Sequence, residues 1–314
     1  MYHSVIRSPL QVYEPCFLDE ASFRRQMHYL RNHFDVLSLS EAVDRIGNGG
    51  FRRPSVAVTF DDGFQNNYEV AFPILREFQL PVTIFLTTGL IDSDDTVWFC
   101  RLNQALAVTN LRVLEWQGQQ LDLSQPESKS AVARLMQERL KRLPHPALLR
   151  ELDQLVSLLG DDPRRSIEQG SPFRMLTHSQ IKEMVASGLV EFGAHTHNHA
   201  ILSRLSHEDQ AREIKQSIAV VEVLTGKACA LFAYPNGGEN DYDRIAIGIL
   251  QGGNVKAAVT TIVGPNDHGT PPLELRRYGV PAGRSLAYFE LLVHHVSVLT
   301  QRMTWRRAEA RQNA

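Results

Sequence analysis

Short apolar segments of strand length alternate with segments of helical spacing along most of this chain. The clearest unit begins at Ser55, where the run Ser-Val-Ala-Val-Thr-Phe predicts a buried strand. A helix is expected over 67–78, and a second buried strand is expected over 80–86 after a break at Pro81. Because a strand, a helix and a strand in succession form a crossover unit, the two strands are predicted to be parallel.

The same alternation extends to both sides of this unit. Upstream, the pattern predicts helices over 18–34 and 40–46, the second opening with Ser40 as its cap, and a short strand over 36–39. Downstream, the expected elements are helices over 176–187, 208–224 and 242–251, and strands over 189–194, 229–234 and 257–262. The alternation predicts an α/β fold, either a (β/α) barrel or a distorted relative of one.

One region, from about 93 to 172, interrupts this rhythm. It carries few strand signals and a charged, leucine-bearing helical stretch over 128–159, which is broken at Pro144 and Pro146. We interpret it as a helical insertion on the barrel, so that residues 1–314 form a single domain.

Composition excludes several classes of protein. With 43% hydrophobic and 22% charged residues, the chain has ordinary values for a globular domain, and its net charge of -2 disfavours a nucleic-acid partner. The three cysteines are far apart and form no CxxC pair, so neither a disulfide framework nor a cysteine zinc site is indicated.

No apolar run has the length of a transmembrane segment, and the N-terminus lacks the pattern of a signal peptide. As written, the chain is expected in the cytoplasm. It opens directly with the motif Met1 to Val5, so an extracytoplasmic location is expected if a preceding export signal has been lost from the start. A basic stretch over 302–311 is interpreted as a solvated helix end.

Polar clusters follow two of the predicted strands. Asp61, Asp62 and Gly63 come directly after the first strand, and adjacent side chains at a strand tip diverge, so one carboxylate can bind a metal while the other faces a substrate. The run His-Thr-His-Asn-His at 195–199 follows another strand and offers imidazoles to a divalent ion. Such edges of α/β sheets commonly hold active sites.

Two different histidine pairs fit this run. His195 and His199 converge if the chain turns after the strand, whereas His195 and His197 point the same way if the chain stays extended. The second geometry is the HxH pattern of barrel amidohydrolases, but that pattern belongs on the first strand and needs further histidines on later strands, which are absent here.

Both clusters together resemble the polysaccharide deacetylase family, carbohydrate esterase family four. In that family a Thr-Phe-Asp-Asp-Gly motif supplies a catalytic base and then a metal ligand, and a His-Ser/Thr-x-x-His motif supplies two further ligands. The resemblance covers about residues 2–282, except most of the insertion. It implies that Asp61 is the base and that Asp62, His195 and His199 hold a divalent metal, for which zinc is the best match.

Later motifs match the family less closely. Residues 232–237, Phe-Ala-Tyr-Pro-Asn-Gly, resemble the substrate-groove motif, with Tyr234, Pro235 and Asn236 expected at the substrate and the Asn236 N–H as an oxyanion donor. The family's arginine that orients the base is replaced by Ala233. Arg277 is a candidate substitute and is expected beside the substrate.

The general acid of the family is a histidine near the C-terminus, and nothing after residue 282 fits that motif. His294 and His295 lie in a predicted amphipathic helix over 288–301 and are interpreted as surface or core residues. The opening residues 2–5, Tyr-His-Ser-Val, instead resemble the circularly permuted branch of the family, in which the strand with this histidine comes first. The acid is therefore assigned to His3.

The resemblance implies a metal-dependent hydrolase that removes an N-acetyl group from a sugar unit of a glycan. Chitin oligomers, peptidoglycan, exopolysaccharide and lipid-linked sugars all fit as substrates. The main alternative from another class is a carbohydrate-binding protein on a decayed deacetylase fold, which the altered groove motif would allow.

Overall fold

Five parallel strands form the centre of the computed structural model, which describes residues 1–295. In spatial order they are β11 (Ala257–Val259), β10 (Leu231–Ala233), β9 (Val190–Ala194), β6 (Val82–Leu86) and β5 (Thr59–Phe60). Every neighbouring pair is parallel, as the alternating pattern predicts. Because both faces of these strands are covered, their sequences are almost continuously apolar.

The sheet curls, and its two edges are joined by segments from opposite ends of the sequence. Tyr2 forms a parallel bridge with Phe60, the last residue of β5. The Val280 N–H donates to the Met1 carbonyl at 3.1 Å. The segment 275–280, which contains Val280, also bridges β11 through its first residue. Hydrogen bonds therefore continue around a distorted barrel, as expected from the sequence.

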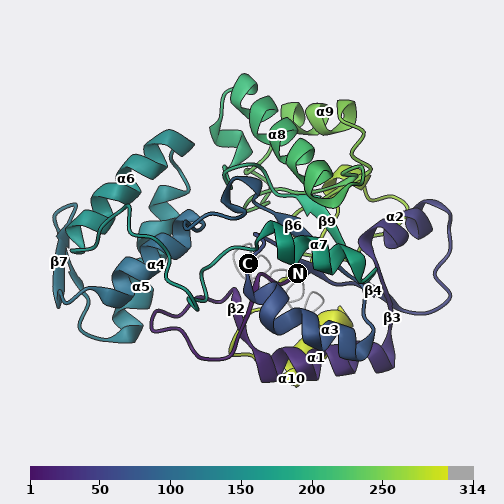
Figure 1. The fold of residues 1–314 in the computed structure, drawn as a ribbon, viewed down its shortest axis with the longest axis horizontal. Coiled ribbons are helices and arrows are strands. Elements are labelled where there is room, and N and C mark those ends of the chain that lie inside the picture. The colour runs from purple at the N-terminus through teal and green to yellow at the C-terminus, as the bar shows by residue number, and fades with distance from the viewer. Residues whose placement is uncertain (296–314) are drawn as a thin grey trace, which may run out of the picture.

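Helices and short strands cover this curl (Figure 1). The helices are α1 (Glu20–His33), α2 (Leu39–Gly47), α3 (Phe72–Phe78), α7 (His178–Ala186), α8 (His207–Thr225), α9 (Arg244–Gly252) and α10 (Leu286–Val293). The short strands β1 (Ser4–Ile6) and β2 (Phe17–Asp19) pair with each other, as do β3 (Asp35–Leu37) and β4 (Ser55–Ala57). Figure 1 shows α1, α3 and α10 on one side of the curl and α8 and α9 on the opposite side.

Several boundaries differ from the sequence prediction. The helix expected over 18–34 begins at Glu20, because Phe17–Asp19 form β2. The cap of α2 is Ser38 and not Ser40, because the Ser38 hydroxyl accepts the Glu41 N–H at 3.1 Å. The strand expected over 55–60 is divided at Val58, since β4 pairs with β3 while β5 pairs with β6. The helix expected over 67–78 starts with a π-helical turn, η1 (Asn67–Ala71), before α3 begins.

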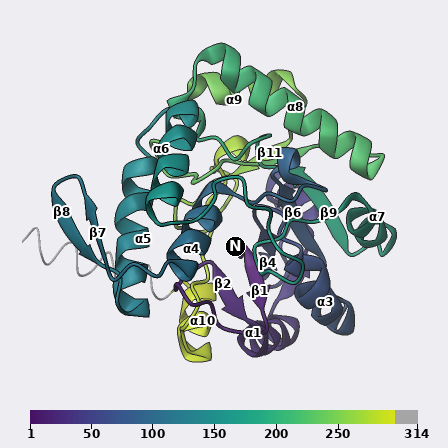
Figure 2. The ribbon, with the colours of Figure 1, turned by 60° about the vertical axis from the view of Figure 1, so that its left-hand side comes forward.

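The insertion forms a lobe beside the barrel (Figures 1 and 2). It contains α4 (Trp98–Val108), a hairpin of β7 (Val113–Trp116) and β8 (Gln119–Asp122), α5 (Pro126–Leu140) and α6 (His145–Leu158). The break between α5 and α6 lies where the two prolines predict it, but the hairpin was not expected. The lobe packs around an apolar cluster of its own, which includes Leu102, Met136 and Leu152.

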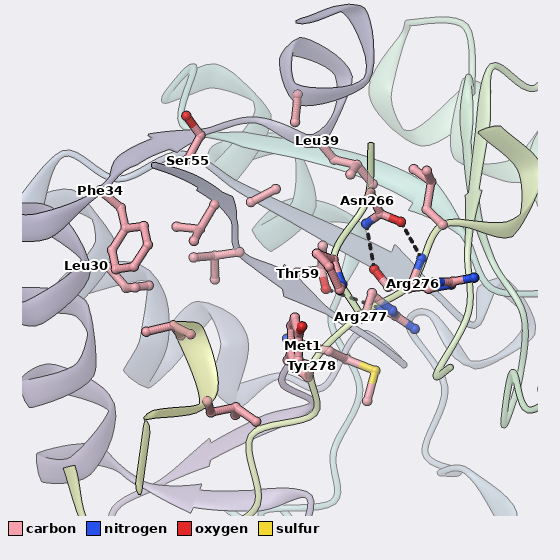
Figure 3. A pocket seen from close by; sticks show the side chains of 18 of the residues that line it. Met1, Leu30, Phe34, Leu39, Ser55, Thr59, Asn266, Arg276, Arg277 and Tyr278 are labelled. Carbon is pink, nitrogen blue, oxygen red and sulfur yellow. Dashed lines mark hydrogen bonds between the residues drawn. The ribbon is translucent and has the colours of Figure 1, made fainter. Parts of the chain in front are cut away.

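A hollow of about 370 Å³ opens between α1, α2, β4 and the segment that precedes α10. Figure 3 shows Leu30 and Phe34 on one wall and Asn266 on another. Thr59 and Arg277 also line it. No predicted metal ligand lines it.

Within residues 1–295, no helix has the length and apolar character needed to cross a membrane. The helix predicted over 288–301 corresponds to α10, which begins at Leu286. The remainder of that predicted helix, and the basic stretch over 302–311, lie outside the described residues.

An aromatic cluster fixes α1 against the strand that carries the first acidic motif. Phe23 of α1 is fully buried, with its ring centroid 5.3 Å from that of Tyr2 and 5.7 Å from that of Phe60. Replacing Phe23 by Ala should lower the free energy of unfolding by about 3–5 kcal/mol, because it removes a buried ring and leaves a cavity among its neighbours. Chemical denaturation measures this. Val223→Ala, at a side chain that is 78% exposed, is the control and should change it by less than about 0.5 kcal/mol.

Candidate functional site

Side chains from two of the parallel strands meet at the carboxyl edge of the sheet. Asp61 and Asp62 follow β5, and His195 follows β9, which is separated from β5 only by β6. His199 comes from the loop after β9. The ligand atoms of Asp62, His195 and His199 all lie within 4.8 Å of one another. The pair His195 and His199 therefore converges on Asp62, which is the first of the two geometries that the sequence allows.

The carboxylate of Asp62 is fully buried between the two imidazoles. Its Oδ1 lies 3.1 Å from Nε2 of His199 and 3.5 Å from Nε2 of His195. Within residues 1–295 neither carboxylate oxygen makes a hydrogen bond of acceptable geometry. Burial alone would raise the pKa of Asp62, but the adjacent imidazoles hold that pKa below its usual value. A buried anion without donors is costly, so this site calls for a cation.

The orientation of His195 follows from its second ring nitrogen. Nδ1 lies 2.8 Å from the carbonyl oxygen of Ala233, and because a carbonyl only accepts, Nδ1 carries the proton. In the neutral imidazole the lone pair is then on Nε2, the nitrogen that faces Asp62 and is available to a metal. Burial lowers the pKa of His195, but Asp62 and Asp61 outweigh burial and raise it above its ordinary value.

His197 points away from this cluster. Its Nδ1 lies 3.0 Å from the Thr88 hydroxyl, and its Nε2 lies 3.0 Å from the side-chain nitrogen of Gln216. Both ring nitrogens are thus engaged by neighbours outside the acidic cluster. The extended HxH pairing of His195 and His197, which the sequence left open, is not formed.

Asp61 faces a different partner from Asp62. The guanidinium of Arg277 donates to both of its oxygens, at 2.7 and 2.8 Å, and also donates to Thr59 Oγ1 and the Thr260 carbonyl. Burial alone would raise the pKa of Asp61, but Arg277 more than offsets this and lowers it. Arg277 is buried and committed to these partners, so it supports the carboxylate, as expected for a substitute of the missing arginine, without lying free for a substrate.

The two adjacent carboxylates diverge because the backbone enters the left-handed conformation at Asp62 but not at Asp61. Asp62 has a φ of 73° and Gly63 a φ of 83°, both in the left-handed region. A side chain at Gly63 would also be strained by its surroundings, because a Cβ there would lie 2.9 Å from Leu86 Cδ2. The tight turn that accounts for an Asp-Asp-Gly sequence is thus also what separates the two functional groups.

His3 enters the same region from the N-terminal segment. The preceding residue, Tyr2, is hydrogen-bonded on both sides of Phe60, and Asn67 donates to the His3 carbonyl at 2.8 Å. Burial lowers the pKa of the His3 imidazole, while the charges of Asp62 and Asp61 raise it in part. The expected pairing beside β5 is limited to the bridge of Tyr2 with Phe60, because Ser4–Ile6 pairs with β2 instead. That bridge places His3 next to the acidic motif, and its role as the acid stays a prediction.

The groove motif forms a tight turn after β10. Asn236 has a φ of 59°, and its N–H has no hydrogen-bond partner among residues 1–295. Tyr234, in contrast, is fully buried, stacks on Tyr242 at 4.1 Å and donates its hydroxyl to the Leu273 carbonyl at 2.9 Å. The Tyr234 side chain therefore lies in the core beneath the turn, and a role for this residue at the substrate stays a prediction.

The alternative acids lie elsewhere. His294 Nε2 is 3.0 Å from the Tyr29 hydroxyl, and His295 Nδ1 is 2.7 Å from the Tyr278 hydroxyl. Both rings belong to the side of the molecule that carries α1 and α10. Neither belongs to the group that could hold a metal.

One buried residue of this region was missed by sequence reasoning. Glu213 of α8 accepts hydrogen bonds from the backbone of the histidine loop, at His197 and Asn198. Its only sequence signal is its position on the buried stripe of α8, next to Ile214 and three residues after Gln210.

Two imidazoles and one carboxylate, each buried, match the donor set that proteins use for zinc at a site with an open position. The unpaired oxygens of Asp62 and the protonated Nδ1 of His195 fit a divalent cation equally well. The residues present therefore suit the metal that the resemblance implies.

Comparison with solved structures identifies the same fold elsewhere. A Streptococcus pyogenes deacetylase, PplD, solved in complex with acetate, matches with a TM-score of 0.60 and 20% identity over 93% of this chain and 96% of its own. IcaB from Ammonifex degensii matches with a TM-score of 0.55 and 20% identity, over 88% of this chain and 91% of its own. The predicted distorted barrel of the polysaccharide deacetylase type is thus confirmed.

Sequence relatives match over a shorter stretch. The poly-beta-1,6-N-acetyl-D-glucosamine N-deacetylase of Staphylococcus epidermidis is 36% identical over 75 residues, which are 24% of this chain and 26% of that protein. The Staphylococcus aureus protein of the same name is 32% identical over 79 residues, 25% of this chain and 27% of its own. These matches span about a quarter of the relatives' length.

A family model described as polysaccharide deacetylase matches residues 48–248, a stretch that contains both the acidic motif and the histidine loop. Since this match extends over more than half of the chain, the protein belongs to the polysaccharide deacetylase family.

Proposed function

We propose that this protein removes the N-acetyl group from an amino-sugar unit of a glycan, using one divalent metal ion. The observation that carries the proposal is the convergence of Asp62, His195 and His199 next to a second carboxylate, Asp61, which is held by Arg277. Family membership supports sugar deacetylation as the reaction. The metal dependence rests on the donor set of these three side chains.

The metal would be held by Asp62, His195 and His199, and zinc suits this donor set best. A divalent ion bound there supplies Lewis-acid chemistry, polarising the acetyl carbonyl and lowering the pKa of a water molecule. The Asp62 carboxylate offsets part of the ion's charge, and the Ala233 carbonyl keeps the His195 ring in the orientation required for binding.

Asp61 acts as the general base in this proposal. Its carboxylate removes a proton from the attacking water, while the two bonds from Arg277 fix the plane of the carboxylate and leave its remaining lone pairs for the water. Because Arg277 also lowers the pKa of Asp61, the base is ionised before substrate arrives.

The tetrahedral oxyanion requires a donor, and the Asn236 N–H is suited to this role because it has no partner among residues 1–295. Pro235 is buried in the same turn, and the preceding Tyr234 ring is fixed in the core by its stack on Tyr242. His3 then protonates the departing amine, which is a poor leaving group without a proton.

The first substrate to test is β-1,6-linked N-acetylglucosamine, because the staphylococcal relatives carry that name. A panel should also include β-1,4-linked oligomers, with acetate release as the measurement. Binding of an oligomer without acetate release by the metal-loaded protein would favour the alternative of a carbohydrate-binding protein.

The metal ligands can be tested by metal content. His195→Ala, His199→Ala and Asp62→Asn should each weaken zinc binding by at least about tenfold, because each removes one of three protein ligands. His197→Ala is the control and should bind zinc as the wild type does, since its ring nitrogens are engaged by Thr88 and Gln216. Equal metal loss in His197→Ala would contradict this ligand set. Elemental analysis after dialysis gives the result.

The base can be separated from the ligands with one substitution. Asp61→Asn should bind zinc normally and yet release no acetate from any oligomer that the wild type deacetylates, because an amide cannot take the proton from water. Metal analysis and acetate release are measured on the same preparation. If the variant is purified without metal, or if it retains wild-type turnover, the role of Asp61 is wrong.

The assignment of the general acid makes a prediction about leaving groups. His3→Ala should lower kcat on the sugar acetamide by roughly 10²–10⁴, the range for loss of one acid catalyst, and leave metal content unchanged. An activated aryl acetate, whose leaving group needs no proton, should be affected much less. His294→Ala and His295→Ala are the matched controls. A normal rate for His3→Ala together with a loss in either control would assign the acid to the residues that follow α10.

A further inference from the structure

We propose that Glu213 of α8 is a positioning residue for the metal site, which holds the loop 195–199 in the conformation that turns His195 and His199 toward Asp62. The inference rests on the metal site of the proposed function. It assigns a role to a buried carboxylate that neither binds the metal in this scheme nor takes part in proton transfer.

Glu213 makes a three-point contact with the loop. One carboxylate oxygen, Oε2, accepts the N–H groups of His197 and Asn198, both at 2.9 Å. The other oxygen, Oε1, accepts from the Asn198 side-chain nitrogen at 2.7 Å. The side chain is buried, so these donors replace the water that an exposed carboxylate would have. Hydrogen bonds to an ionised acceptor are stronger than those between neutral groups.

The opposite side of the loop rests on η2 (Thr88–Leu90). The N–H groups of Thr88 and Gly89 donate to the carbonyls of Thr196 and His197, at 3.3 and 2.7 Å. Gly89 is needed for this approach, because a Cβ at this position would lie 2.7 Å from the His197 carbonyl oxygen. Glu213 binds the N–H side of the same peptide groups. The loop is therefore hydrogen-bonded to η2 on one side and to α8 on the other.

These hydrogen bonds are important because the loop backbone is strained. Thr196 and His199 have φ values of 59° and 56°, and neither is a glycine. Residues with side chains occupy this region only where their surroundings impose it. His199 reaches Asp62 only through this turn, since an extended chain would direct His197 there instead. The three bonds from Glu213 therefore favour the conformation that brings the second imidazole to the site.

Only an ionised carboxylate satisfies this geometry. All three groups that face Glu213 are N–H donors, and a carboxylate is the one side chain here with acceptors on both oxygens. Glutamine has nearly the same shape, but its amide presents a donor to at least one of these N–H groups. Glu213→Gln therefore removes the complementarity with little change in volume.

The test is the zinc affinity of the full-length protein, measured by competition with a chelator. Glu213→Gln should bind zinc about 10- to 100-fold more weakly than the wild type, the range for loss of a residue that orients metal ligands. Glu208→Gln makes the same chemical change at an exposed position of α8 and should bind zinc as the wild type does. Far-UV circular dichroism checks that both variants are folded.

Cobalt(II) provides a readout that a general loss of stability would not move. The visible absorption of the cobalt-loaded protein reports the ligand geometry, and it should change in Glu213→Gln, even with cobalt in excess, but not in Glu208→Gln. A folded Glu213→Gln protein with the wild-type zinc affinity and cobalt spectrum would overturn the inference. If the wild type itself binds neither zinc nor cobalt, the proposed function fails. If the wild type binds metal and Glu213→Gln is unaffected, only the role of Glu213 fails, so the two failures are distinguishable.

Asn198→Ala provides a second test if Glu213→Gln does not fold. It removes one of the three bonds to Glu213 from an exposed side chain and leaves the two backbone bonds. Zinc affinity should fall by about two- to tenfold, as expected for one hydrogen bond. If Glu213→Gln is unfolded and Asn198→Ala has an unchanged zinc affinity, the contact between Glu213 and the loop does not act on the metal site.

Discussion

The fully buried carboxylate of Asp62 is the constraint on which the rest of the site depends. It has no hydrogen-bond donor of acceptable geometry within residues 1–295, and it lies between two imidazoles that are themselves buried. An anion in such surroundings is unfavourable unless a cation compensates for it. The neighbouring groups are arranged accordingly: the Ala233 carbonyl sets the tautomer of His195, and the left-handed turn at His199 brings in the second ring. Arg277 is kept on Asp61 and away from Asp62.

The closure of the barrel explains why the site can use residues from both ends of the described chain. His3 and Arg277 are far apart in sequence, but the segment 275–280 is hydrogen-bonded to Met1, while Tyr2 pairs with Phe60. The N-terminal residues and the segment 275–280 together form the seam that closes the barrel. This seam therefore places the His3 imidazole and the Arg277 guanidinium near the end of β5. The arginine that is absent at position 233 is replaced by one from this seam, which can reach the carboxylate because the seam runs beside it.

Local chemistry at strand ends was predictable from the sequence, because a buried strand and the polar residues at its tip are both encoded within a few positions. The order of strands and helices was therefore correct outside β2 and the insertion, and the resemblance supplied the proposed roles of Asp61 and Asp62. Long-range choices were less accessible. Whether Arg277 would reach Asp61 depends on how the barrel closes, and the burial of Tyr234 depends on Tyr242 and Leu273. Glu213 could not be assigned because its partners are backbone N–H groups, which leave no mark on the sequence.

The helical insertion contacts the cluster of Asp62, His195 and His199, although it packs around an apolar cluster of its own. The ring of Phe99, in α4, lies 5.9 Å from that of His199 in an edge-on arrangement. His145, at the start of α6, also lies near this region. Burial lowers the pKa of its imidazole, the charge of Glu213 raises that pKa, and His199 lowers it. The lobe is also fixed to the N-terminal loop, since buried Glu14 accepts from Asn103 of α4. Since α4 is anchored there and its Phe99 ring packs edge-on beside His199, the insertion contributes to the burial of an imidazole that the barrel loop supplies.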